Sequence, residues 1–506
     1  MFGLLLDALL ILVITTPLIG RLMDYTKLSR YRDKICGLYA LLGLFVSVYP
    51  LYILYETVAS KSVVVITFLE RYAPPLGACL EIDMLSVYMA SLILGLAIAA
   101  CLYSIRYMEH DTGLVLYYVL LLGLVAGMVG VVFAGDLFTL FIFWELMCLA
   151  SYCLVAYRKE RWAPVEAGFK FLIMSSFGNV TVLFAMSLLY GATGTLNLAF
   201  LALSLKNAAS SVWILLAMVM IIIGFGVEAA IVPLHFWLPD AHPEAPSPVS
   251  ALLSGVVIKT GGYALLRILF LVFPSVQMSW HLMLAIASVV TMTVGNLMAL
   301  LQEDLKRLLA YSSVAQMGYV IFGLTSAYGV TASLFHVMNH AIMKGLLFFC
   351  AGCYVHMTGT RDVNELSGVW KRMPLTTIAF TVGAFAIAGM PPLNGFLSEL
   401  MLIMAGIRAG TVPAQSYMNV FAAIMILNVL FSVAYYLRLV QTFVLKKESP
   451  TVVKAHEAPF SMLIPVSLLA LLCILIGVYP YPFLSFAERA ANAVTQVSSY
   501  ISAITG

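Results

Sequence analysis

Long apolar stretches with almost no charge are the feature that most restricts how this chain can fold. A helix crosses the hydrocarbon core of a bilayer, about 30 Å thick, in roughly 20 apolar residues, and the sequence divides into such lengths almost from end to end. Charged residues make up 10% of the chain and hydrophobic residues 62%, whereas soluble domains carry about 25% charged residues. A soluble enzyme is therefore excluded, and because no long basic run occurs we expect no nucleic-acid partner.

The hydrophobic pattern predicts an all-α polytopic membrane protein with about fourteen transmembrane helices. With the N-terminus outside, seventeen Lys and Arg residues, including Lys27, fall in inner loops, against five in outer segments, including Arg71. The positive-inside rule then places both termini outside. The predicted spans are 2–22, 35–55, 84–104, 114–134, 137–157, 168–190, 212–237, 248–272, 280–301, 309–328, 330–355, 375–405, 418–444 and 460–480.

The seventh and twelfth spans are too long for one crossing and contain helix-breaking residues. Pro233 follows Glu228 in the seventh span, and Pro391 and Pro392 precede Glu399 in the twelfth. Backbone groups freed at membrane depth are tolerated only around a buried or hydrated cavity. Paired broken helices in two halves of a chain are typical of a transport site.

Spacing also indicates an internal repeat. Lys170 precedes Glu228 by 58 residues, and Lys344 precedes Glu399 by 55. Spans four to eight and nine to thirteen would form two five-helix units, and since five is odd, the second unit enters the membrane inverted. The expected organisation is an N-terminal three-helix region (1–112), a first repeat (113–272), a second repeat (273–445), and a last helix with an interfacial C-terminal segment (446–506).

Ionisable side chains within the spans are candidates for an ion pathway, because each costs a few kcal/mol unless it is paired or meets water. Asp7, Asp136, Arg267 and Arg438 lie close to span ends, and we expect these four to reach the interface. The candidates at membrane depth are Glu145, Lys170, Glu228, His235, Lys259, His336, His340, Lys344 and Glu399.

Glu145 lies in a deeply apolar stretch with no polar neighbour at helical spacing. A buried Glu–Lys pair can store or release a proton when a nearby charge changes. Lys170 and Lys259 are both candidate partners for Glu145, and the sequence alone does not distinguish them.

His336, His340 and Lys344 fall at i, i+4 and i+8, on one face of a helix. We interpret this row as a proton relay in which Lys344 supplies a biasing charge. A zinc site and simple interhelix hydrogen bonding are the alternatives. Zinc is disfavoured because no glutamate follows the first histidine and an ammonium group would repel a dication.

The chain has no GxGxxG after a strand, no Walker A loop, no iron–sulfur cysteine spacing and no haem-attachment sequence. We therefore expect no cofactor and no catalytic site on this chain. Any redox chemistry that drives transport would be carried out by partner polypeptides.

Several motifs resemble the antiporter-like subunits of complex I, which share ancestry with Mrp-type sodium/proton antiporter subunits and membrane-bound hydrogenases. They are LHFWLPDAHPEAPSPVSALLSGVVIKTG at 234–261, NHAIMK at 339–344 and WEL at 144–146. The resemblance covers roughly residues 80–445. The segments 358–362 and 391–399 favour the hydrogenase and formate-hydrogenlyase branch.

The resemblance implies fourteen helices, two inverted five-helix repeats, broken helices seven and twelve, and a hydrophilic axis along the membrane plane. Glu228 stands where the family usually has a lysine that pairs with the glutamate of helix five. This departure puts the usual Glu–Lys switch in doubt and keeps sodium coupling open. The residues that the resemblance assigns to the axis are Glu145 in helix five, Lys259 in helix eight, His336 and His340, and Glu399 in helix twelve.

The leading hypothesis is a proton-translocating subunit of a multi-subunit, complex-I-related oxidoreductase, such as a membrane-bound hydrogenase or a quinone- or ferredoxin-linked dehydrogenase. It would lie in the cytoplasmic membrane of a prokaryote, with other membrane subunits and a peripheral redox arm as partners. One alternative is a subunit of a stand-alone Mrp-type Na⁺/H⁺ antiporter. Another is a structural subunit that has lost transport, which Glu228 would favour.

Overall fold

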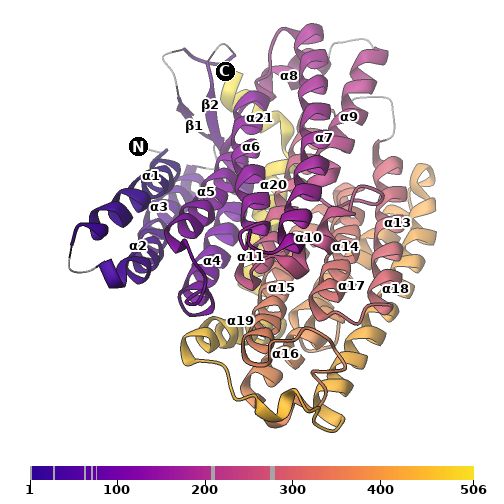
Figure 1. Cartoon of the computed structure of the whole chain (residues 1–506). Helices are drawn as coiled ribbons and strands as arrows, with labels where there is room; N and C mark the ends of the chain where they lie inside the picture. Colours follow the sequence, from indigo (N-terminus) through magenta and orange to yellow (C-terminus); the bar gives the residue numbers. More distant parts are fainter. Residues whose placement is uncertain are drawn as a thin grey trace.

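The described part of the chain forms a bundle of long helices with one small two-stranded sheet (Figure 1). Our computed structural model describes residues 3–26, 29–61, 64–69, 72–75, 77–206, 211–273 and 280–505. Within these residues, eleven helices are long and apolar enough to cross a membrane. Each of the fourteen predicted spans coincides with a helix or with consecutive helices, so the all-α polytopic membrane fold is confirmed. Lys27 and Arg71, used to predict the orientation, lie outside the described residues.

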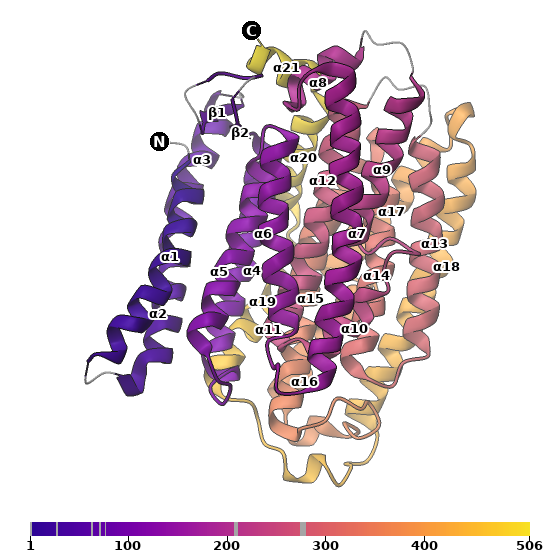
Figure 2. The ribbon, with the colours of Figure 1, turned by 45° about the horizontal axis from the view of Figure 1, so that its top comes forward.

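The N-terminal helices form one edge of the bundle (Figures 1 and 2). The second predicted span is two helices, which meet at Ser47. An antiparallel sheet, in which Val65 pairs with Ile82, connects this edge to the next helix and was not predicted. The elements are α1 (Leu4–Asp24), α2 (Arg32–Val46), α3 (Val48–Lys61), β1 (Val65–Phe68), β2 (Cys79–Ile82) and α4 (Met84–Tyr107).

The helices of the first predicted repeat include the most enclosed part of the molecule. In the span Ser247–Val272, 94% of the residues in its most apolar stretch are buried inside the molecule, against 33% in α1. The elements are α5 (Leu114–Phe133), α6 (Leu137–Val155), α7 (Trp162–Thr193), α8 (Leu198–Lys206), α9 (Val212–Glu228), α10 (Trp237–Glu244), α11 (Ser247–Leu252) and α12 (Ile258–Val272).

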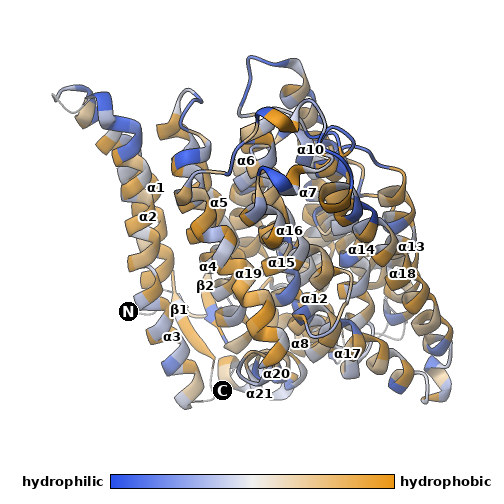
Figure 3. Cartoon of the chain, turned by 90° about the horizontal axis from the view of Figure 1, so that it is seen from below, coloured by the Kyte–Doolittle hydropathy of each residue, from blue (hydrophilic) through white to orange (hydrophobic). Residues whose placement is uncertain are grey.

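The second predicted repeat is followed by three helices, of which the last two return to the N-terminal edge. Figure 3 shows that the helices are mainly hydrophobic along their length, whereas hydrophilic segments concentrate in the connecting loops. The elements are α13 (Trp280–Leu300), α14 (Leu305–Leu324), α15 (Val330–Thr358), α16 (Pro374–Ile387), α17 (Asn394–Ala409), α18 (Tyr417–Val440), α19 (Phe460–Val478), α20 (Tyr481–Thr495) and α21 (Val497–Thr505).

A Thr-Gly-Thr loop follows the long helix of each repeat. Gly194 after α7 and Gly359 after α15 are both left-handed, with φ of 74° and 75°. The Leu137 N–H donates to the carbonyl two residues after Gly194 (2.9 Å), and the Leu305 N–H donates to the carbonyl two residues after Gly359 (2.8 Å). The first loop lies at the α8 end of the bundle and the second at the α16 end (Figure 2). The two repeats are therefore inverted relative to each other, as predicted.

The two helix breaks share the same backbone hydrogen bonds. After α9, the Ile231 N–H donates to the Gly226 carbonyl at 3.0 Å, and after α16 the Met390 N–H donates to the Phe385 carbonyl at 3.0 Å. The residue before each donor is left-handed, with φ of 54° and 69° respectively. This is a helix C-terminal motif that satisfies the last carbonyls of the helix.

The predicted breaks are thus present, with Pro233 between α9 and α10 and with Pro391 and Pro392 between α16 and α17. Each break turns the chain out of one helix and into another at the depth of the bundle interior. The helix segments on either side of a break can therefore carry different polar groups into that interior.

The repeat register predicted from spacing is wrong. Glu228 is the last residue before the first break, whereas Glu399 lies after the second break, in α17. Counted from the helix break of each repeat, the position in the first repeat that is equivalent to Glu399 is Asp240, in α10. The same spacing made Lys170 and Lys344 equivalent positions of the two repeats, and this equivalence is wrong for the same reason.

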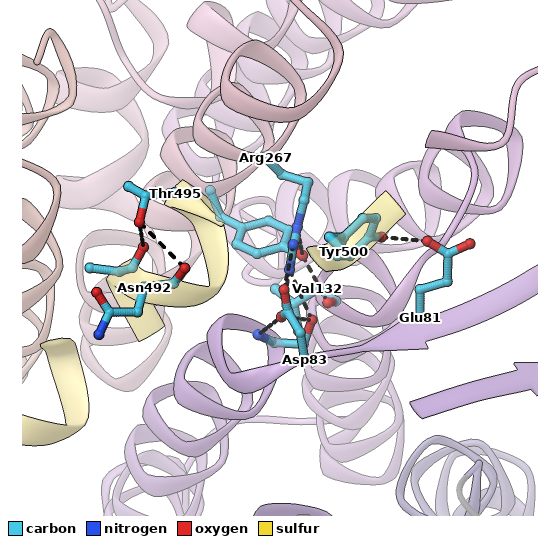
Figure 4. Close-up of polar contacts among 10 residues, drawn as sticks. Glu81, Asp83, Val132, Arg267, Asn492, Thr495 and Tyr500 are labelled. Carbon is cyan, nitrogen blue, oxygen red and sulfur yellow. Dashed lines mark hydrogen bonds and ion pairs between the residues drawn. The ribbon is translucent and has the colours of Figure 1, made fainter. Parts of the chain in front are cut away.

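Arg267 does not reach the interface as predicted but is buried, with 4% of its surface exposed. Its guanidinium donates to both carboxylate oxygens of Asp83, at 2.6 and 2.7 Å (Figure 4). Burial raises the pKa of Asp83, but the charge and hydrogen bonds of Arg267 bring that pKa below its usual value. The ring of Tyr500 lies against the guanidinium, and its hydroxyl donates to Glu81 (Figure 4). This cluster joins α12, α21 and the start of α4.

Two of the other residues that we expected to reach the interface instead cap helices, and for Asp136 the prediction is wrong because its carboxylate is buried. Asp136 is buried and accepts a hydrogen bond from the Thr139 N–H at 2.7 Å. Arg438 donates to the Leu300 carbonyl at 2.9 Å, at the end of α13. Asp7 is exposed, as predicted.

Candidate functional site

Among the residues that the structure describes, eight ionisable side chains are buried in the middle of the bundle, each with at most 4% of its surface exposed. They come from the end of α9, from the turn after it, from α10, from α12, from α15 and from α17. Buried ionisable groups in a membrane protein are rare and mark ion pathways by default. The eight residues are Glu228, His235, His242, Lys259, His336, His340, Lys344 and Glu399, of which only His242 was not singled out from the sequence.

Glu145 and Lys170, the other two sequence candidates, do not join this group. Glu145 lies on α6 and is partly exposed on this chain. Lys170 lies near the start of α7, with 49% of its side chain exposed, and pairs with Glu166 (2.9 Å) and Asp240 (3.1 Å). Among the described residues, neither Lys170 nor Lys259 forms an ion pair with Glu145. The expected Glu–Lys pair is therefore not present in this structure.

Glu228 ends α9 directly before the first break. Its Oε2 accepts a long hydrogen bond from the Cys148 Sγ at 3.9 Å, and its Oε1 has no partner within the described part of the chain. The helix reaches this depth because Gly178 of α7 packs against Gly224, where a Cβ on Gly178 would lie 2.8 Å from the Gly224 carbonyl oxygen. A buried carboxylate oxygen without a donor is unfavourable. A proton or a cation at Oε1 would relieve that cost.

A π-helical turn over Leu253–Val257 separates α11 from α12 and positions Lys259. The Lys259 Nζ donates to the Ser254 carbonyl at 2.6 Å, across this turn. The Ser254 hydroxyl shares a hydrogen bond with the Ser313 hydroxyl of α14 at 2.7 Å. Because π turns disrupt the regular α-helical ladder, they are frequent at functional sites. Lys259 is thus held by a carbonyl and not by a carboxylate.

Lys344 has a similar neutral environment. Its Nζ donates to the Leu309 carbonyl at 2.8 Å and to the Tyr436 hydroxyl at 3.2 Å. Tyr436 also shares a hydrogen bond with Ser312 at 2.8 Å. Either lysine can therefore release a proton without first breaking an ion pair.

Both ring nitrogens of His242 and of His340 lack hydrogen-bond partners among the described residues. His242 stacks on Phe348 at 4.6 Å, close enough to Lys344 to be affected by its charge. The ring centre of His340 lies 6.1 Å from that of His336. Unpaired buried imidazole nitrogens need an explanation, and exchangeable protons or small buried water molecules supply one.

A continuous hydrogen-bonded chain leads from α15 to α17. The His336 Nε2 donates to the Gln316 Oε1 at 2.6 Å, and the Gln316 Nε2 donates to the Glu399 Oε1 at 3.3 Å. On the other side of the imidazole, the His336 Nδ1 lies 2.9 Å from the Ser398 hydroxyl. Ser398 also lies 3.1 Å from the Gly395 carbonyl oxygen.

This arrangement accepts His336 with or without its second proton. When His336 is neutral, the Ser398 hydroxyl donates to Nδ1; when it is a cation, Nδ1 donates and the hydroxyl turns to the Gly395 carbonyl. Only the rotation of one hydroxyl separates the two states. Small rearrangements of this kind suit a group that gains and loses a proton repeatedly.

The second break supports the end of this chain. Asn339 and Asn394 donate to each other, at 3.1 and 3.2 Å, and fix the start of α17 to α15. A Cβ on Gly389 would lie 2.3 Å from the Glu399 Oε2, so the break needs glycine where the carboxylate approaches the backbone. That Oε2 has no partner in the parts of the chain that the structure covers.

A polar cavity of about 390 Å³ opens near the Gly359 loop. Lys306 lines it, is buried, and donates to the Ala245 carbonyl at 2.8 Å. Arg361 bridges Asp304 (2.5 Å) and Glu244 (2.8 Å) beside it. Burial lowers the pKa of Arg361, but these two carboxylates raise it above its usual value, so Arg361 stays positively charged. The cavity therefore presents charges of both signs at one end of the buried group.

The zinc alternative for His336 and His340 is not supported by their contacts. Both ring nitrogens of His336 are engaged by Ser398 and Gln316. Among the described residues, no group of three or more His, Cys, Asp or Glu side chains could hold a metal ion.

Comparison with known proteins gives consistent matches. The family profile described as "NADH:quinone oxidoreductase/Mrp antiporter, TM" matches residues 134–426, and the complex I chain 5 N-terminus profile matches residues 75–118. NADH-quinone oxidoreductase subunit N of Desulforudis audaxviator is 35% identical over 81% of this chain and 84% of its own length. One Na⁺/H⁺ antiporter subunit of Alkalihalophilus pseudofirmus is 36% identical over 87% of this chain and 58% of its own length.

Among solved structures, one chain of the membrane-bound sulfane sulfur reductase, described as an archaeal respiratory membrane complex, superposes with a TM-score of 0.90. It is 29% identical, and the match covers 99% of both chains. Fold, helix breaks, sequence profile and relatives therefore agree. The chain belongs to the NADH:quinone oxidoreductase/Mrp antiporter family of transmembrane subunits, as an antiporter-like subunit of complex-I-related membrane complexes.

Proposed function

We propose that this chain translocates protons as a membrane subunit of a multi-subunit, complex-I-related oxidoreductase. The observation that carries the proposal is the hydrogen-bonded chain from His336 through Gln316 to Glu399, buried among apolar helices. His336 and Glu399 are the protonatable ends of this chain, and an amide that bridges them by hydrogen bonds can pass a proton between them by a change of tautomer. The redox cofactors would be bound by partner subunits.

The buried group suggests a route through the chain. In this proposal a proton enters from the polar cavity at Lys306, and His242 passes it to Lys344. From there it moves along the face of α15 that carries His340 and His336. Glu399 receives it last: the Gln316 Oε1 takes the His336 proton as the Gln316 Nε2 gives one to Glu399, and the imidic acid so formed reverts to the amide before the next transfer.

The two central lysines would couple the steps by repulsion. Like charges in a low-dielectric interior repel strongly, and both lysines are buried, so in this proposal a positive charge on Lys259 opposes one on Lys344. Because neither lysine is tied to a carboxylate among the described residues, this repulsion is not cancelled locally. A charge that arrives next to either lysine from a partner subunit would therefore move protons along the chain.

The type of complex is part of the proposal. The similarity to a sulfane sulfur reductase chain extends over 99% of both chains, and a quinone oxidoreductase subunit is among the sequence relatives. Both observations support a redox-driven complex, such as a membrane-bound hydrogenase or a quinone- or ferredoxin-linked dehydrogenase, in the cytoplasmic membrane of a prokaryote. Both termini lie at one end of the bundle (Figure 2), and we assign that end to the outside.

A second candidate is a subunit of a stand-alone Na⁺/H⁺ antiporter. The specific observation in its favour is Glu228, whose Oε1 has no hydrogen-bond partner among the described residues and could bind a cation. The similarity to the Alkalihalophilus pseudofirmus antiporter protein is also substantial, although this chain covers 58% of that protein's length.

Proton uptake by inverted vesicles that contain the whole complex tests the proposal. Redox substrate should drive sodium-independent acidification, and Lys259→Ala should abolish it while the complex still assembles. Normal pumping by the assembled Lys259→Ala complex would overturn the proposal. Acidification that requires both sodium and an imposed ion gradient, without redox substrate, would instead establish the antiporter.

Glu228 is tested in the same vesicles. If its charge takes part in transport, Glu228→Gln impairs pumping more than Glu228→Asp does. Wild-type pumping by Glu228→Gln would show that the charge is not used.

A further inference from the structure

A long seam separates α3 from α20, with α4 at its base. Residues 48–59 of α3 line one wall and residues 482–493 of α20 line the other, in each case at the three- and four-residue spacing of a single helix face. Gln496, which follows α20, and residues 499–503 of α21 extend the second wall. The seam contains two cavities, of about 540 and 700 Å³. Because the same faces of α3 and α20 line both cavities, the two cavities form one continuous groove.

The smaller cavity is apolar. Leu51, Leu94 and Phe486 line it, and Phe486 closes its base by packing edge-on against Tyr55 and Tyr88 at 5.8 and 4.9 Å. The groove also passes over an exposed glycine of α4, Gly95, where an added Cβ would have no atom within 4 Å. This part of the seam offers an open apolar channel at the depth of the membrane interior.

The larger cavity is polar along the α20 wall. Arg489, Asn492 and Gln496 line it, and Arg489 donates to the Tyr55 hydroxyl at 3.3 Å where the two cavities meet. Asp83 also lines this cavity, but Arg267 already binds its carboxylate (Figure 4). Within the described residues, Arg489 forms no ion pair. The cavity therefore has one uncompensated positive charge.

The polarity of the groove follows that of a bilayer. The polar cavity lies beside the end of α3 and the start of α4, where the chain leaves the predicted spans. The apolar cavity lies beside the first half of α3 and the middle of α4. A transmembrane helix from a partner would bury Arg489, Asn492 and Gln496 against hydrocarbon, which is costly. A lipid has a polar end and an apolar end in the order that the groove requires.

We propose that this seam binds one phospholipid with an anionic headgroup. Its phosphate pairs with Arg489 and accepts hydrogen bonds from the side-chain amides of Asn492 and Gln496. One acyl chain fills the apolar cavity over Gly95. The lipid then joins the N-terminal edge of the bundle to α20.

Photo-crosslinking of the assembled complex tests this proposal. The probe is phosphatidylglycerol with a diazirine on one acyl chain, and labelled peptides are located by mass spectrometry. We expect labels within residues 48–59, 91–98 and 482–493, and we expect unlabelled phosphatidylglycerol to compete better than phosphatidylcholine. Arg489→Gln should reduce this labelling at least fivefold, and Gly95→Leu should displace it from α4.

Two variants serve as matched controls. Arg408→Gln removes an exposed arginine that lies over Tyr328 on another face, and Gly191→Leu adds a side chain at an exposed glycine with equally open surroundings. Neither should change the labelling. Labelling that avoids the three segments, that survives both Arg489→Gln and Gly95→Leu, or that phosphatidylcholine competes equally well would overturn the proposal. Gly95→Leu tests the acyl site even if Arg489→Gln fails to assemble.

Discussion

Replacing Gln316 with Leu removes the one side chain that joins His336 to Glu399. In the native chain, Gln316 lies 2.6 Å from the His336 Nε2 and 3.3 Å from the Glu399 Oε1. The change leaves both of these atoms without a hydrogen-bond partner. Each buried polar atom left unsatisfied costs about 1–3 kcal/mol, so the stability loss is roughly 2–6 kcal/mol. A hydrogen bond to a charged group contributes about 1.5–3 kcal/mol. At about 1.4 kcal/mol per factor of ten, a transfer that uses this hydrogen bond becomes roughly ten to a hundred times slower without it.

We therefore expect Gln316→Leu to slow redox-driven proton pumping at least tenfold in vesicles that contain the assembled complex. Gln316→Glu, which can still accept from His336 and carry a proton, should retain more of the activity. Gln302→Leu is the matched control, because Gln302 only donates to the Met298 carbonyl at the end of α13. Pumping at the wild-type rate by an assembled Gln316→Leu complex would refute the relay through this residue.

Three further predictions concern stability. Gly395→Ala would place a Cβ 1.8 Å from a backbone carbonyl oxygen of α16. Thermal unfolding should therefore show that the variant loses about 1–3 kcal/mol of stability or more. The control is Gly226→Ala, whose added Cβ would lie no closer than 3.6 Å to its neighbours and which should melt like the wild type. Asp83→Asn leaves Arg267 buried without its carboxylate, and a loss of about 3–5 kcal/mol is expected; an unchanged melting temperature would contradict this. Burial raises the pKa of Glu81 more than its hydrogen bonds lower it. Its folded pKa therefore exceeds the unfolded value of about 4.3, and its contribution to stability, present at low pH, is lost as pH rises through that window. Glu81→Gln should remove this pH dependence in melts recorded from acidic to neutral pH.

The membrane spans could be predicted because length and hydrophobicity leave few other solutions for such a chain. The breaks were equally accessible, since proline and glycine interrupt the helical hydrogen bonds wherever they fall. The short sheet was missed because four-residue strands next to long apolar helices give almost no periodic signal.

The buried ionisable residues of the site were mostly predicted, because charges within spans are few and conspicuous. Lys170 was misplaced because α7 begins at Trp162, several residues before the predicted span, and so brings Lys170 beside Glu166 and Asp240. Its expected partnership with Glu145 depended on depth, which hydrophobicity alone locates poorly.

The partners of the buried residues could not be predicted. Gln316, His336 and Glu399 come from three different helices, and no local pattern indicates that their side chains meet. His242 lies in a short polar helix after a break, where its burial follows only from the packing of α10 against α14 and α15.

The repeat register shows how spacing can mislead. The two Thr-Gly-Thr segments are visible in the sequence and fix the register: the residue as far before Gly194 as Lys344 is before Gly359 is Asn179, and not Lys170. Charged residues are poor markers of a repeat, because each half can change its charges while the backbone turns stay the same.

The π turn at Leu253–Val257 makes the length of this segment more restrictive than its composition. Each residue of an α-helix turns the chain by about 100°. Deleting one residue here, so that the turn becomes an ordinary α-helix, would swing α11 and the polar helix before it around the axis of α12 by about that angle. Lys259 and His242 would then face different neighbours without either having been replaced.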